Sequence, residues 1–276
     1  MKFSIVTPTY NRAYILGTAI QSVIAQTYAD WELIIVDDGS SDDTEKLVYN
    51  FHDDRIKYFH QINKGPSAAR NHGLEMASGD WIAYIDSDNE LLSNYLGVME
   101  DVIRKNPQSL YALPKGNRTL ELYRENKLVE KIDDSSDFPD ELTPRDIAWR
   151  KIHFDINGFM HHKKIVEDGI RFDETMDSLE DWDFALTICE KYPDRFLYVP
   201  VKLFNYHQRF GTDGLVSNAS YGKWAQSFET IYQKHKNDKL MMGQNWYPDR
   251  VNKYKRLEEE FQQGKIQPNY LRYFTK

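Results

Sequence analysis

The first hundred residues alternate between two hydrophobic periods, and this alternation constrains the fold more than any other feature. Short apolar runs such as "KFSIVT" and "WELIIVD" indicate strands, while residues 13–28 carry an apolar stripe at helical spacing. A helix around residues 44–51, the strand "RIKYFH", the helix "GPSAARNHGLEMASG" and the strand "DWIAYI" continue the series. A β-α-β-α-β-α-β order folds into a parallel sheet covered by helices on both faces, because parallel strands need crossover connections. We therefore predict an α/β fold with a mostly parallel sheet.

The pattern changes beyond the fourth predicted strand and indicates a mixed region followed by a helical tail. After one more helix, the segments "SLYALPKGN", "TLELYREN" and "KLVEKID" predict antiparallel strands. The segment "SLEDWDFALTICEKY" predicts a helix that Ser178 caps, with Asp181 at capping-box spacing. The segment "RFLYVPVKLFNYH" predicts a pair of strands broken at Pro200. Residues 220–276 are aromatic and charged and predict helices.

The composition disfavours several classes of protein. The 276 residues carry 35 basic and 43 acidic side chains, a formal net charge of −8, which argues against a general nucleic-acid-binding surface. The single cysteine, Cys189, allows no intramolecular disulfide and indicates a reducing compartment. The apolar run at the start is too short for a signal peptide, and no stretch approaches the ~20 apolar residues of a membrane span. We predict a cytoplasmic protein, and basic residues of the tail leave peripheral contact with the inner face of the membrane open.

Two carboxylates one residue apart follow the fourth predicted strand, in "YIDSDNE". Asp86 and Asp88 are expected to point the same way at the strand tip, because side chains two residues apart share a face. Two such groups can hold a hard cation, with phosphate oxygens and water as the remaining ligands. The alternative is a turn and a helix N-cap, which also favour aspartate. The spacing alone does not decide between a cation site and a turn.

The other strands of the predicted parallel sheet end in polar residues at the same edge. Residues 7–11 close the first strand, and Asp37 and Asp38 close the second. Ligands of open α/β sheets bind outside this edge. A carboxylate there can accept the ring N–H of a uracil or thymine base, since a buried donor without an acceptor is costly. A strand-to-helix turn is the alternative, because "DGSSDDT" is rich in turn and N-cap residues.

Four further positions are candidates for chemistry, each with a structural alternative. Arg70, in the third helix, is either a solvated residue or a ligand for a nucleotide phosphate or base edge. Asp181, beside Glu180 in a first helical turn, is either a partner of the helix dipole or a general base. His207, before a glycine-rich loop, is either structural or a contact of a metal or diphosphate. The histidines at 161–162 match no metal-binding spacing and are predicted to be structural or to line an acceptor site.

The ordered set of these motifs resembles the family 2 glycosyltransferases, which have the GT-A fold. The resemblance is carried by "SIVTPTYNRAYILGTAIQSVIAQTYADWELIIVDDGSSDDT", "NKGPSAARNHGLEMASGDWIAYIDSDN", "FDETMDSLEDWDFALTI" and "YHQRFGTDGLVS". It covers residues 3–100 and, less closely, residues 155–217. It implies a Rossmann-like, mostly parallel GT-A sheet flanked by helices, with a mixed acceptor side. Residues 1–100 are then the nucleotide-sugar-binding half, 101–217 the acceptor-binding half and 218–276 a C-terminal helical extension.

The resemblance also implies an inverting, metal-assisted transfer from a nucleotide-sugar donor to a saccharide or glycolipid acceptor. The donor is usually a UDP-sugar, and the cofactor is Mn²⁺ or Mg²⁺. By position, Asp88 is the expected metal ligand, His207 a further metal or diphosphate contact, and Asp181 the general base. Asp38 is expected to meet the nucleotide base, and Asp86 to lie near the ribose. The residues expected to line the nucleotide-sugar site are Pro8, Thr9, Tyr10, Asp38, Arg70, Asp86 and Ser87.

Two other functions remain open at this point. A catalytically silent nucleotide-sugar-binding or scaffold protein could keep the same fold, although the Asp-x-Asp and Glu-Asp pairs are both intact. A nucleotidyltransferase also joins such a sheet to a metal, but it normally carries a glycine-rich basic loop after the first strand, and "TPTYNR" has no glycine. A dinucleotide dehydrogenase is disfavoured because G-x-G-x-x-G is absent there.

Overall fold

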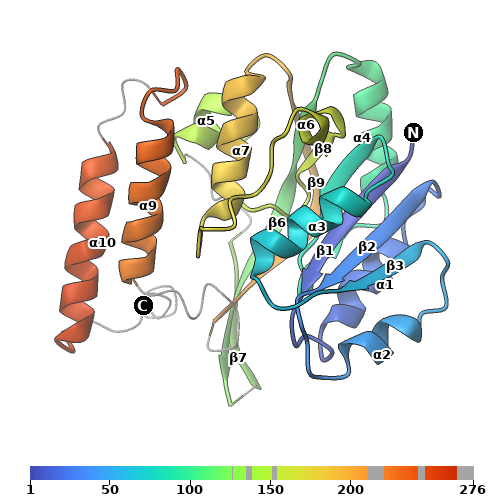
Figure 1. The fold of residues 1–276 in the computed structure, drawn as a ribbon, viewed down its shortest axis with the longest axis horizontal. Coiled ribbons are helices and arrows are strands. Elements are labelled where there is room, and N and C mark those ends of the chain that lie inside the picture. The colour runs from blue at the N-terminus through green and yellow to red at the C-terminus, as the bar shows by residue number, and fades with distance from the viewer. Residues whose placement is uncertain (126, 135–138, 151–153, 211–220, 242–245, 266–276) are drawn as a thin grey trace.

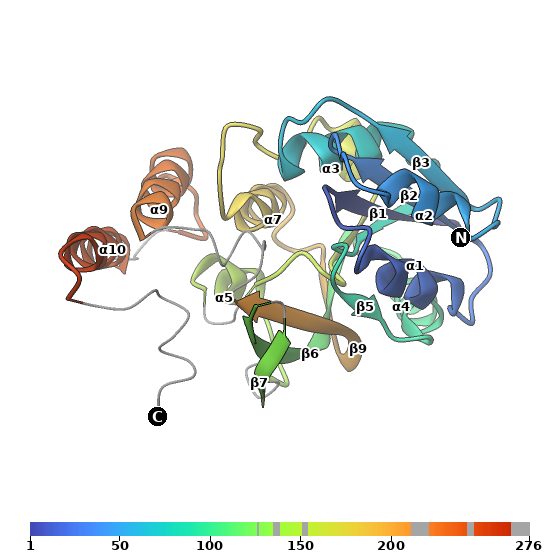
Figure 2. The same cartoon turned by 90° about the horizontal axis from the view of Figure 1, so that it is seen from below.

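The fold is known from a computed structural model, which describes residues 1–125, 127–134, 139–150, 154–210, 221–241 and 246–265. These residues form one mixed sheet of nine strands, with helices on both faces (Figure 1, Figure 2). The α/β fold class predicted from the sequence is confirmed.

The first half of the sheet is parallel, as the alternation in the sequence predicts. Its strands are β1 (Phe3–Thr9), β2 (Trp31–Asp37), β3 (Ile56–His60) and β4 (Trp81–Tyr84). The helices between them are α1 (Leu16–Ile24), α2 (Thr44–Tyr49) and α3 (Pro66–Met76). All seven residues of β2 are buried, because both faces of this part of the sheet are covered. The strands lie in the order β3-β2-β1-β4, and because every pairing is parallel their carboxyl ends meet at one edge.

The second half of the sheet is mixed and is built around two long strands. Its strands are β5 (Glu90–Leu91), β6 (Tyr111–Arg124), β7 (Lys127–Asp133), β8 (Met160–His162) and β9 (Phe196–Phe210). Its helices are α4 (Tyr95–Lys105), α5 (Pro144–Ala148), α6 (Lys164–Glu167) and α7 (Glu180–Lys191). The strand order continues from β4 through β8, β6 and β9 to β5. Strand β7 pairs with β6 in a hairpin that projects from the body of the molecule (Figure 1).

Two predictions for this half are wrong. The predicted strands "SLYALPKGN" and "TLELYREN" form the single strand β6, and the predicted break at Pro200 lies inside the continuous strand β9. Strands β6 and β9 pair in parallel, but consecutive residues of β6 pair with Val199 and Lys202. Pro200 therefore falls in a bulge. A residue in a bulge does not need to donate a hydrogen bond to the neighbouring strand, so proline, which has no N–H, is tolerated there. The pairing with β6 lets β9 continue through a proline.

The chain continues into two helices, α9 (Tyr221–His235) and α10 (Trp246–Gln262), so the predicted helical tail is confirmed for the described residues. They lie side by side at the end of the molecule far from β3 (Figure 1, Figure 2). Both helices share a hydrophobic core with α7. Phe228 of α9 contacts the edge of Trp182 at 6.0 Å between ring centroids and stacks on Tyr254 of α10 at 5.4 Å. Within the described ranges, no helix combines the length and apolarity needed to cross a membrane.

A buried carboxylate joins the amino ends of the strands, at the edge of the sheet opposite the strand tips. Glu32 of β2 accepts hydrogen bonds from the ammonium groups of Lys2 and Lys57 at 3.1 and 2.7 Å, and it is 2% exposed. Ser4 Oγ and Ser78 N also donate to it, at 2.6 and 2.7 Å. Burial by itself raises the pKa of Glu32, but these donors outweigh burial and lower the pKa to about 2.

We expect Glu32→Gln to lower the free energy of unfolding at neutral pH by about 3 kcal/mol. The pKa of Glu32 is about 2 in the folded chain and 4.5 ordinarily, and each unit corresponds to roughly 1.4 kcal/mol. Because the folded pKa is the lower one, this stabilisation is complete above pH 4.5 and is lost as the pH falls toward 2. Urea denaturation at neutral pH and at about pH 3 measures this effect. The difference in free energy of unfolding between variant and wild type should be smaller at the acidic pH.

The control for this measurement is Asp140→Asn, which removes the exposed partner of Lys115. It should leave the free energy of unfolding almost unchanged, because exposed ion pairs contribute little. A loss in Glu32→Gln that is the same at both pH values would contradict the ionic explanation.

Candidate active site

The carboxyl ends of the parallel strands open into a cavity of about 550 Å³. Its wall includes the ends of β1, β2 and β4, the first turns of α3 and α7, and β9. Every residue that the sequence analysis assigned to the site lines this one cavity: Pro8, Thr9, Tyr10, Asp38, Arg70, Asp86, Ser87, Asp88, Asp181 and His207. The structure therefore brings together residues that lie up to about 200 positions apart in the sequence.

Arg70 of α3 lies in the wall of the cavity and joins two carboxylates. Its Nη2 donates to Asp86 Oδ1 at 2.9 Å, and its Nη1 donates to Glu180 Oε1 at 2.8 Å. The side chain is 5% exposed. Burial by itself lowers the pKa of the guanidinium, but the charges of Asp86 and Glu180 outweigh burial and raise the pKa of Arg70. Arg70 therefore holds the end of β4 against the first turn of α7.

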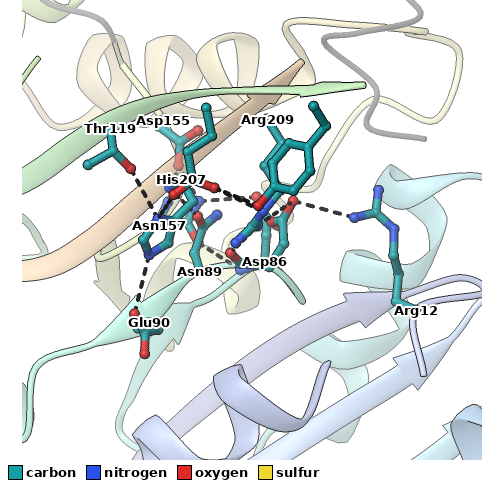
Figure 3. Close-up of polar contacts among 12 residues, drawn as sticks. Arg12, Asp86, Asn89, Glu90, Thr119, Asp155, Asn157, His207 and Arg209 are labelled. Atoms are coloured by element: carbon teal, nitrogen blue, oxygen red, sulfur yellow. Dashed lines mark hydrogen bonds and ion pairs between the residues drawn. The ribbon is translucent and has the colours of Figure 1, made fainter. Parts of the chain in front are cut away.

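Asn157 joins the end of β4 to the loop before β8. Its Oδ1 accepts from the backbone N–H of Asp86 at 2.7 Å, and its Nδ2 donates to Asp86 Oδ2 at 3.1 Å. The same Nδ2 donates to Asp155 Oδ1, which also accepts from the backbone N–H of Asn157 at 2.9 Å (Figure 3). Burial, followed by the charge of Asp86, raises the pKa of Asp155 to about 7. Asp155 lines the cavity, so a further carboxyl group lies close to Asp86.

Two arginines approach Asp88, the second aspartate of the Asp-x-Asp motif. Arg12, after β1, and Arg209, in β9, each place Nη1 at 3.4 Å from Asp88 Oδ2. Arg209 Nη1 also donates to the backbone carbonyl of Asp88 at 2.6 Å. Figure 3 shows both arginines directed toward the Asp-x-Asp turn. Burial and the charge of Asp86 nevertheless raise the pKa of Asp88.

The chemistry of this turn fits a hard divalent cation. Carboxylate oxygens are the ligands that Mg²⁺ and related ions prefer, and a cation would relieve the repulsion that raises the pKa of Asp88. In the part of the chain that the structure describes, no group of three or more His, Cys, Asp or Glu could hold a metal. A cation at Asp88 would therefore take most of its ligands from a bound diphosphate and from water.

His207 of β9 lines the cavity with both ring nitrogens close to other side chains. Nδ1 lies 3.0 Å from Thr119 Oγ1 and 3.1 Å from Glu121 Oε1. Nε2 lies 3.2 Å from Glu90 Oε2 (Figure 3). A role as metal ligand requires Glu90 to release Nε2, and that role stays a prediction. The glycine-rich segment that follows β9 lies outside the described residues.

Asp38, at the end of β2, is held by the loop that leads into α3. One carboxylate oxygen accepts from Gln61 Nε2 and Lys64 N at 2.7 and 2.9 Å, and the other accepts from Gly65 N at 2.7 Å. Gly65 has a φ of 91°, which favours glycine at this position. These three donors fix the carboxylate in the cavity wall, and its contact with a nucleotide base stays a prediction. Tyr10 lines the same cavity and is 48% exposed.

Asp181 lies in the first turn of α7, as predicted, but the predicted cap of this helix is wrong. The residue before the helix is Leu179, with a φ of 62°, and no side chain caps the helix. Ser178 instead forms a hydrogen bond with Ser227 of α9, with 2.8 Å between the two Oγ atoms. Ser178 therefore binds a helix that is distant in the sequence and does not cap α7. The spacing of nearby residues in the sequence carries no information on such a contact.

Asp181 lies at the positive end of the dipole of α7, which by itself lowers the pKa of a carboxyl group. Burial dominates: together with the charges of Glu180 and Asp155, it raises the pKa of Asp181 well above its ordinary value. Asp181 Oδ1 accepts from the backbone N–H of Trp182 at 2.7 Å, which orients the carboxylate. A carboxylate with a raised pKa is a stronger base than an exposed one.

His161 belongs to the core and not to the cavity. It is fully buried, its Nε2 accepts from the hydroxyl of Tyr84 at 2.7 Å, and its Nδ1 donates to the carbonyl of His162 at 3.1 Å. Burial lowers the pKa of His161 to about 4, so the ring is neutral at neutral pH. Of the two interpretations that the sequence allowed, the structural one is confirmed.

The cavity also contains residues that the sequence analysis missed. They come from loops and from the tail, where no hydrophobic period marks a functional position: Arg12, Arg150, Asp155 and Trp224. Arg12 follows β1 in "YNR", and Asp155 stands two residues before Asn157 in "DIN". The segment "DIN" places two polar side chains two residues apart, as the Asp-x-Asp motif does. That spacing is the feature of the sequence that could have indicated Asp155 as a site residue.

Known proteins resemble this chain in both sequence and fold. Residues 4–169, more than half of the chain, match the family described as "Glycosyl transferase family 2". The chain is 34% identical over 224 residues to a Campylobacter jejuni protein named GalNAc(5)-diNAcBac-PP-undecaprenol beta-1,3-glucosyltransferase. This match covers 79% of this chain and 68% of that protein. It is 37% identical over 150 residues to Escherichia coli WfgD, named UDP-Glc:alpha-D-GlcNAc-diphosphoundecaprenol beta-1,3-glucosyltransferase. This match covers 54% of this chain and 54% of that protein.

Solved structures agree on the fold. S. aureus TarS 1–349 in complex with UDP-GlcNAc matches with a TM-score of 0.69 and 17% identity, over 96% of this chain and 93% of that chain. The Pyrobaculum calidifontis mannosyltransferase PcManGT, in complex with GDP-Man and Mn²⁺, matches with a TM-score of 0.63 and 15% identity, over 94% of this chain and 75% of that chain. At these identities the solved structures show the fold, whereas the family match and the relatives show the family. The chain belongs to glycosyl transferase family 2 and is a glycosyltransferase with the GT-A fold.

Proposed function

We propose that the chain moves a sugar from a UDP-sugar to a hydroxyl group of a lipid-linked glycan, in one displacement that inverts the anomeric centre. The observation that carries this proposal is the single cavity that holds Asp86, Asp88 and Asp181, with Arg70 connecting its two sides. The names of the relatives support the substrates, because both include an undecaprenol-linked glycan and one includes UDP-Glc. Complexes of TarS with UDP and UDP-GlcNAc support a uridine nucleotide.

The donor is proposed to lie along the strand tips. Tyr10 offers an exposed aromatic ring on which a base can stack, and Asp38 offers carboxylate oxygens at the end of β2. Arg12 and Arg209 add positive charge beside the Asp-x-Asp turn, where the diphosphate would lie. The proposed nucleotide-sugar site comprises Pro8, Thr9, Tyr10, Asp38, Arg70, Asp86 and Ser87.

Asp88 is the proposed ligand of a divalent cation, and His207 is a second contact once Glu90 releases its Nε2. When bound, Mn²⁺ or Mg²⁺ supplies positive charge that stabilises the diphosphate as it leaves the sugar. The Mn²⁺ in the complex of the Pyrobaculum mannosyltransferase supports this cofactor. Arg12 and Arg209 lie beside the same leaving group and would share in neutralising it.

Asp181 is the proposed general base. An alcohol is a weak nucleophile, and a positioned carboxylate that takes its proton accelerates such a reaction typically by about 10²–10⁴-fold. The raised pKa of Asp181 suits this role, because it brings the carboxylate closer to neutral pH. A single displacement needs the base and the leaving diphosphate on opposite sides of the sugar, and it needs no covalent enzyme intermediate.

We propose a division of labour along the chain on the same grounds. Residues 1–100 bind the donor, residues 101–217 form the acceptor side that carries Asp181, and residues 218–276 are a C-terminal helical extension. The extension contributes Trp224 to the cavity wall. Because an undecaprenol-linked acceptor is anchored in lipid, the enzyme is proposed to work at the surface of a membrane by peripheral contact.

Hydrolysis of nucleotide sugars tests the proposed function without knowledge of the acceptor. The chain is incubated with UDP-glucose, UDP-galactose, UDP-GlcNAc and GDP-mannose in the presence of Mn²⁺, and the released nucleoside diphosphate is measured. We expect slow transfer to water from one UDP-sugar in preference to the others. Tight UDP binding with no release from any donor would favour a silent binding protein, and pyrophosphate release from UTP would favour a nucleotidyltransferase.

We expect Asp88→Ala to lower the affinity for UDP in the presence of Mn²⁺ by at least about 10-fold. Replacing a residue that only hydrogen-bonds to a metal ligand already lowers metal affinity by about 10-fold, and loss of the ligand itself should cost at least as much. In EDTA the variant should bind UDP at least as tightly as the wild type, because without the cation the carboxylate only repels the diphosphate. Isothermal titration calorimetry with and without Mn²⁺ measures both values. Asp101→Asn, on the exposed face of α4, is the control and should bind as the wild type does. An affinity loss that persists in EDTA would remove the metal from the explanation.

A further inference from the structure

We propose that Asp155 binds hydroxyl groups of the donor's sugar and thereby selects which nucleotide sugar the enzyme uses, with Asn157 as its positioning residue. This inference rests on the proposed function, because it assigns a role within the same cavity. It concerns the sugar alone and not the nucleotide, the cation or the acceptor.

The two oxygens of the Asp155 carboxylate have different surroundings. Oδ1 accepts from the backbone N–H of Asn157 at 2.9 Å and from its side-chain Nδ2. For Oδ2, the described residues include no hydrogen-bond partner, while the side chain is only half-buried and lines the cavity. One oxygen is thus held by the protein, and we infer that the other is left to bind a ligand in the cavity that Asp155 lines. A carboxylate in this state is a fixed acceptor for hydroxyl donors of a ligand.

The orientation of Asn157 is determined by its partners. Its Oδ1 accepts from the backbone N–H of Asp86 at 2.7 Å, so the other end of the amide must be Nδ2. Nδ2 donates to both Asp86 and Asp155. Asn157 itself is fully buried, which removes the freedom to turn toward solvent. A single amide therefore sets the position of Asp155 relative to the Asp-x-Asp motif.

This position is the place of the sugar in the proposed reaction. A sugar in transit lies between its diphosphate, at Asp86 and Asp88, and the acceptor hydroxyl, at Asp181. Hydrogen bonds run without a gap from Asp155 through Asn157, Asp86 and Arg70 to Glu180, the neighbour of Asp181. The negative charge of Asp155 also acts on Asp181, where it contributes to the raised pKa. Asp155 therefore belongs to the network that spans the two proposed ends of the reaction, and it lines the cavity in which the sugar would lie.

A carboxylate is well suited to distinguish sugars. Epimers differ in the direction of one hydroxyl, and a site that binds that hydroxyl rejects the epimer because a polar group is then left unpaired. An apolar wall discriminates less, since it can accommodate an additional or displaced hydroxyl. Three neighbouring carboxylates of the cavity wall are already paired with arginines: Asp86 and Glu180 bind Arg70, and Asp88 binds Arg12 and Arg209.

The test compares UDP with UDP-sugars in wild type, Asp155→Asn and Asp155→Ala. Binding of UDP in the presence of Mn²⁺ is measured by calorimetry, and hydrolysis of UDP-glucose, UDP-galactose, UDP-GlcNAc and UDP-GalNAc is measured by UDP release. We expect both variants to bind UDP within about 3-fold of wild type, which also shows that they fold. We expect hydrolysis of the preferred sugar to fall by about 10–100-fold and the preference over its epimer to narrow by a similar factor.

Asn157→Ala tests the positioning role separately. It should narrow the preference between epimers in the same way, and adding Asp155→Ala to it should change the preference by less than about 2-fold, because the two residues act as one unit. Asp140→Asn, which removes an exposed carboxylate from the loop before α5, is the matched control and should keep the wild-type preference.

Three results would overturn the inference. The preference among sugars could stay the same in both Asp155 variants, UDP affinity could fall as much as hydrolysis does, or hydrolysis could remain normal while transfer to an acceptor is lost. These results would leave the proposed function intact. A wild-type chain that binds no UDP and hydrolyses no donor would instead overturn the proposed function, and this inference with it.

Discussion

Replacing Asp181 with asparagine is expected to lower the rate of sugar transfer by about 10²–10⁴-fold while the affinity for UDP stays within about 2-fold of wild type. The amide keeps the size and the place of the side chain, but it cannot take a proton from the acceptor hydroxyl. The proposed nucleotide contacts are other residues of the cavity wall, at the ends of β1, β2 and β4, so binding of the nucleotide should be unaffected. A transfer assay and calorimetry with UDP, on the same preparations, separate the two effects.

The pH dependence of the reaction gives a second measure of the same group. A general base must be ionised, so the rate should rise with pH through the pKa of Asp181 and fall below it. Since burial raises that pKa, the fall should begin well above the range of an ordinary aspartate. The Asp181→Asn variant should lack this limb of the profile, and Asp101→Asn should keep it. Full turnover in Asp181→Asn would show that another group accepts the proton.

Replacing Arg70 with methionine is expected to lower the free energy of unfolding by about 3–5 kcal/mol at neutral pH. The change leaves Glu180, which is 7% exposed, and Asp86 without the guanidinium that joins them. Removing one partner of a buried ion pair is costly, because the remaining charge is desolvated and unpaired. Urea denaturation measures the loss, and methionine preserves most of the volume of the arginine stem.

Two further variants separate charge from packing at this position. Arg70→Lys keeps a positive charge but lacks the planar fork that bridges two carboxylates, so it should lose an intermediate amount of stability. Adding Glu180→Gln to Arg70→Met should recover part of the loss, since it removes one of the two unpaired charges. A double variant that is as unstable as the sum of the two single variants would mean that Arg70 contributes by packing alone.

The parallel half of the sheet was predictable because its signals are local. Each strand of this half is a short apolar run, each helix has its own stripe, and the order of these elements determines a parallel sheet with one functional edge. The same order, taken from the sequence alone, predicts that Asp38, Asp86 and Asp88 lie at that edge. Asp181 was placed by its helix and by the family resemblance.

The features that the sequence did not reveal depend on partners distant in the chain. Pro200 lies inside a strand because β6 pairs around it, and Ser178 leaves the helix cap because Ser227 binds it. Asp155 and Asn157 lie in a loop with no hydrophobic period, and they reach the site only once β4 and β8 are paired. Local propensity carries no information on such contacts, which are formed by tertiary packing.

The attachment of α9 to α7 sets a limit on how the enzyme can be shortened or recombined. On one side of Asp181, Ser178 is bonded to Ser227, and on the other side Asp183 receives Lys234 Nζ at 2.6 Å and lies 2.9 Å from His235 Nε2. A fragment that stops at the end of β9, or a chimaera that takes its C-terminal helices from a related protein, would lose the contacts that hold the helix turn of Asp181, the proposed base. Any minimal catalytic unit made from this protein must carry α9 along.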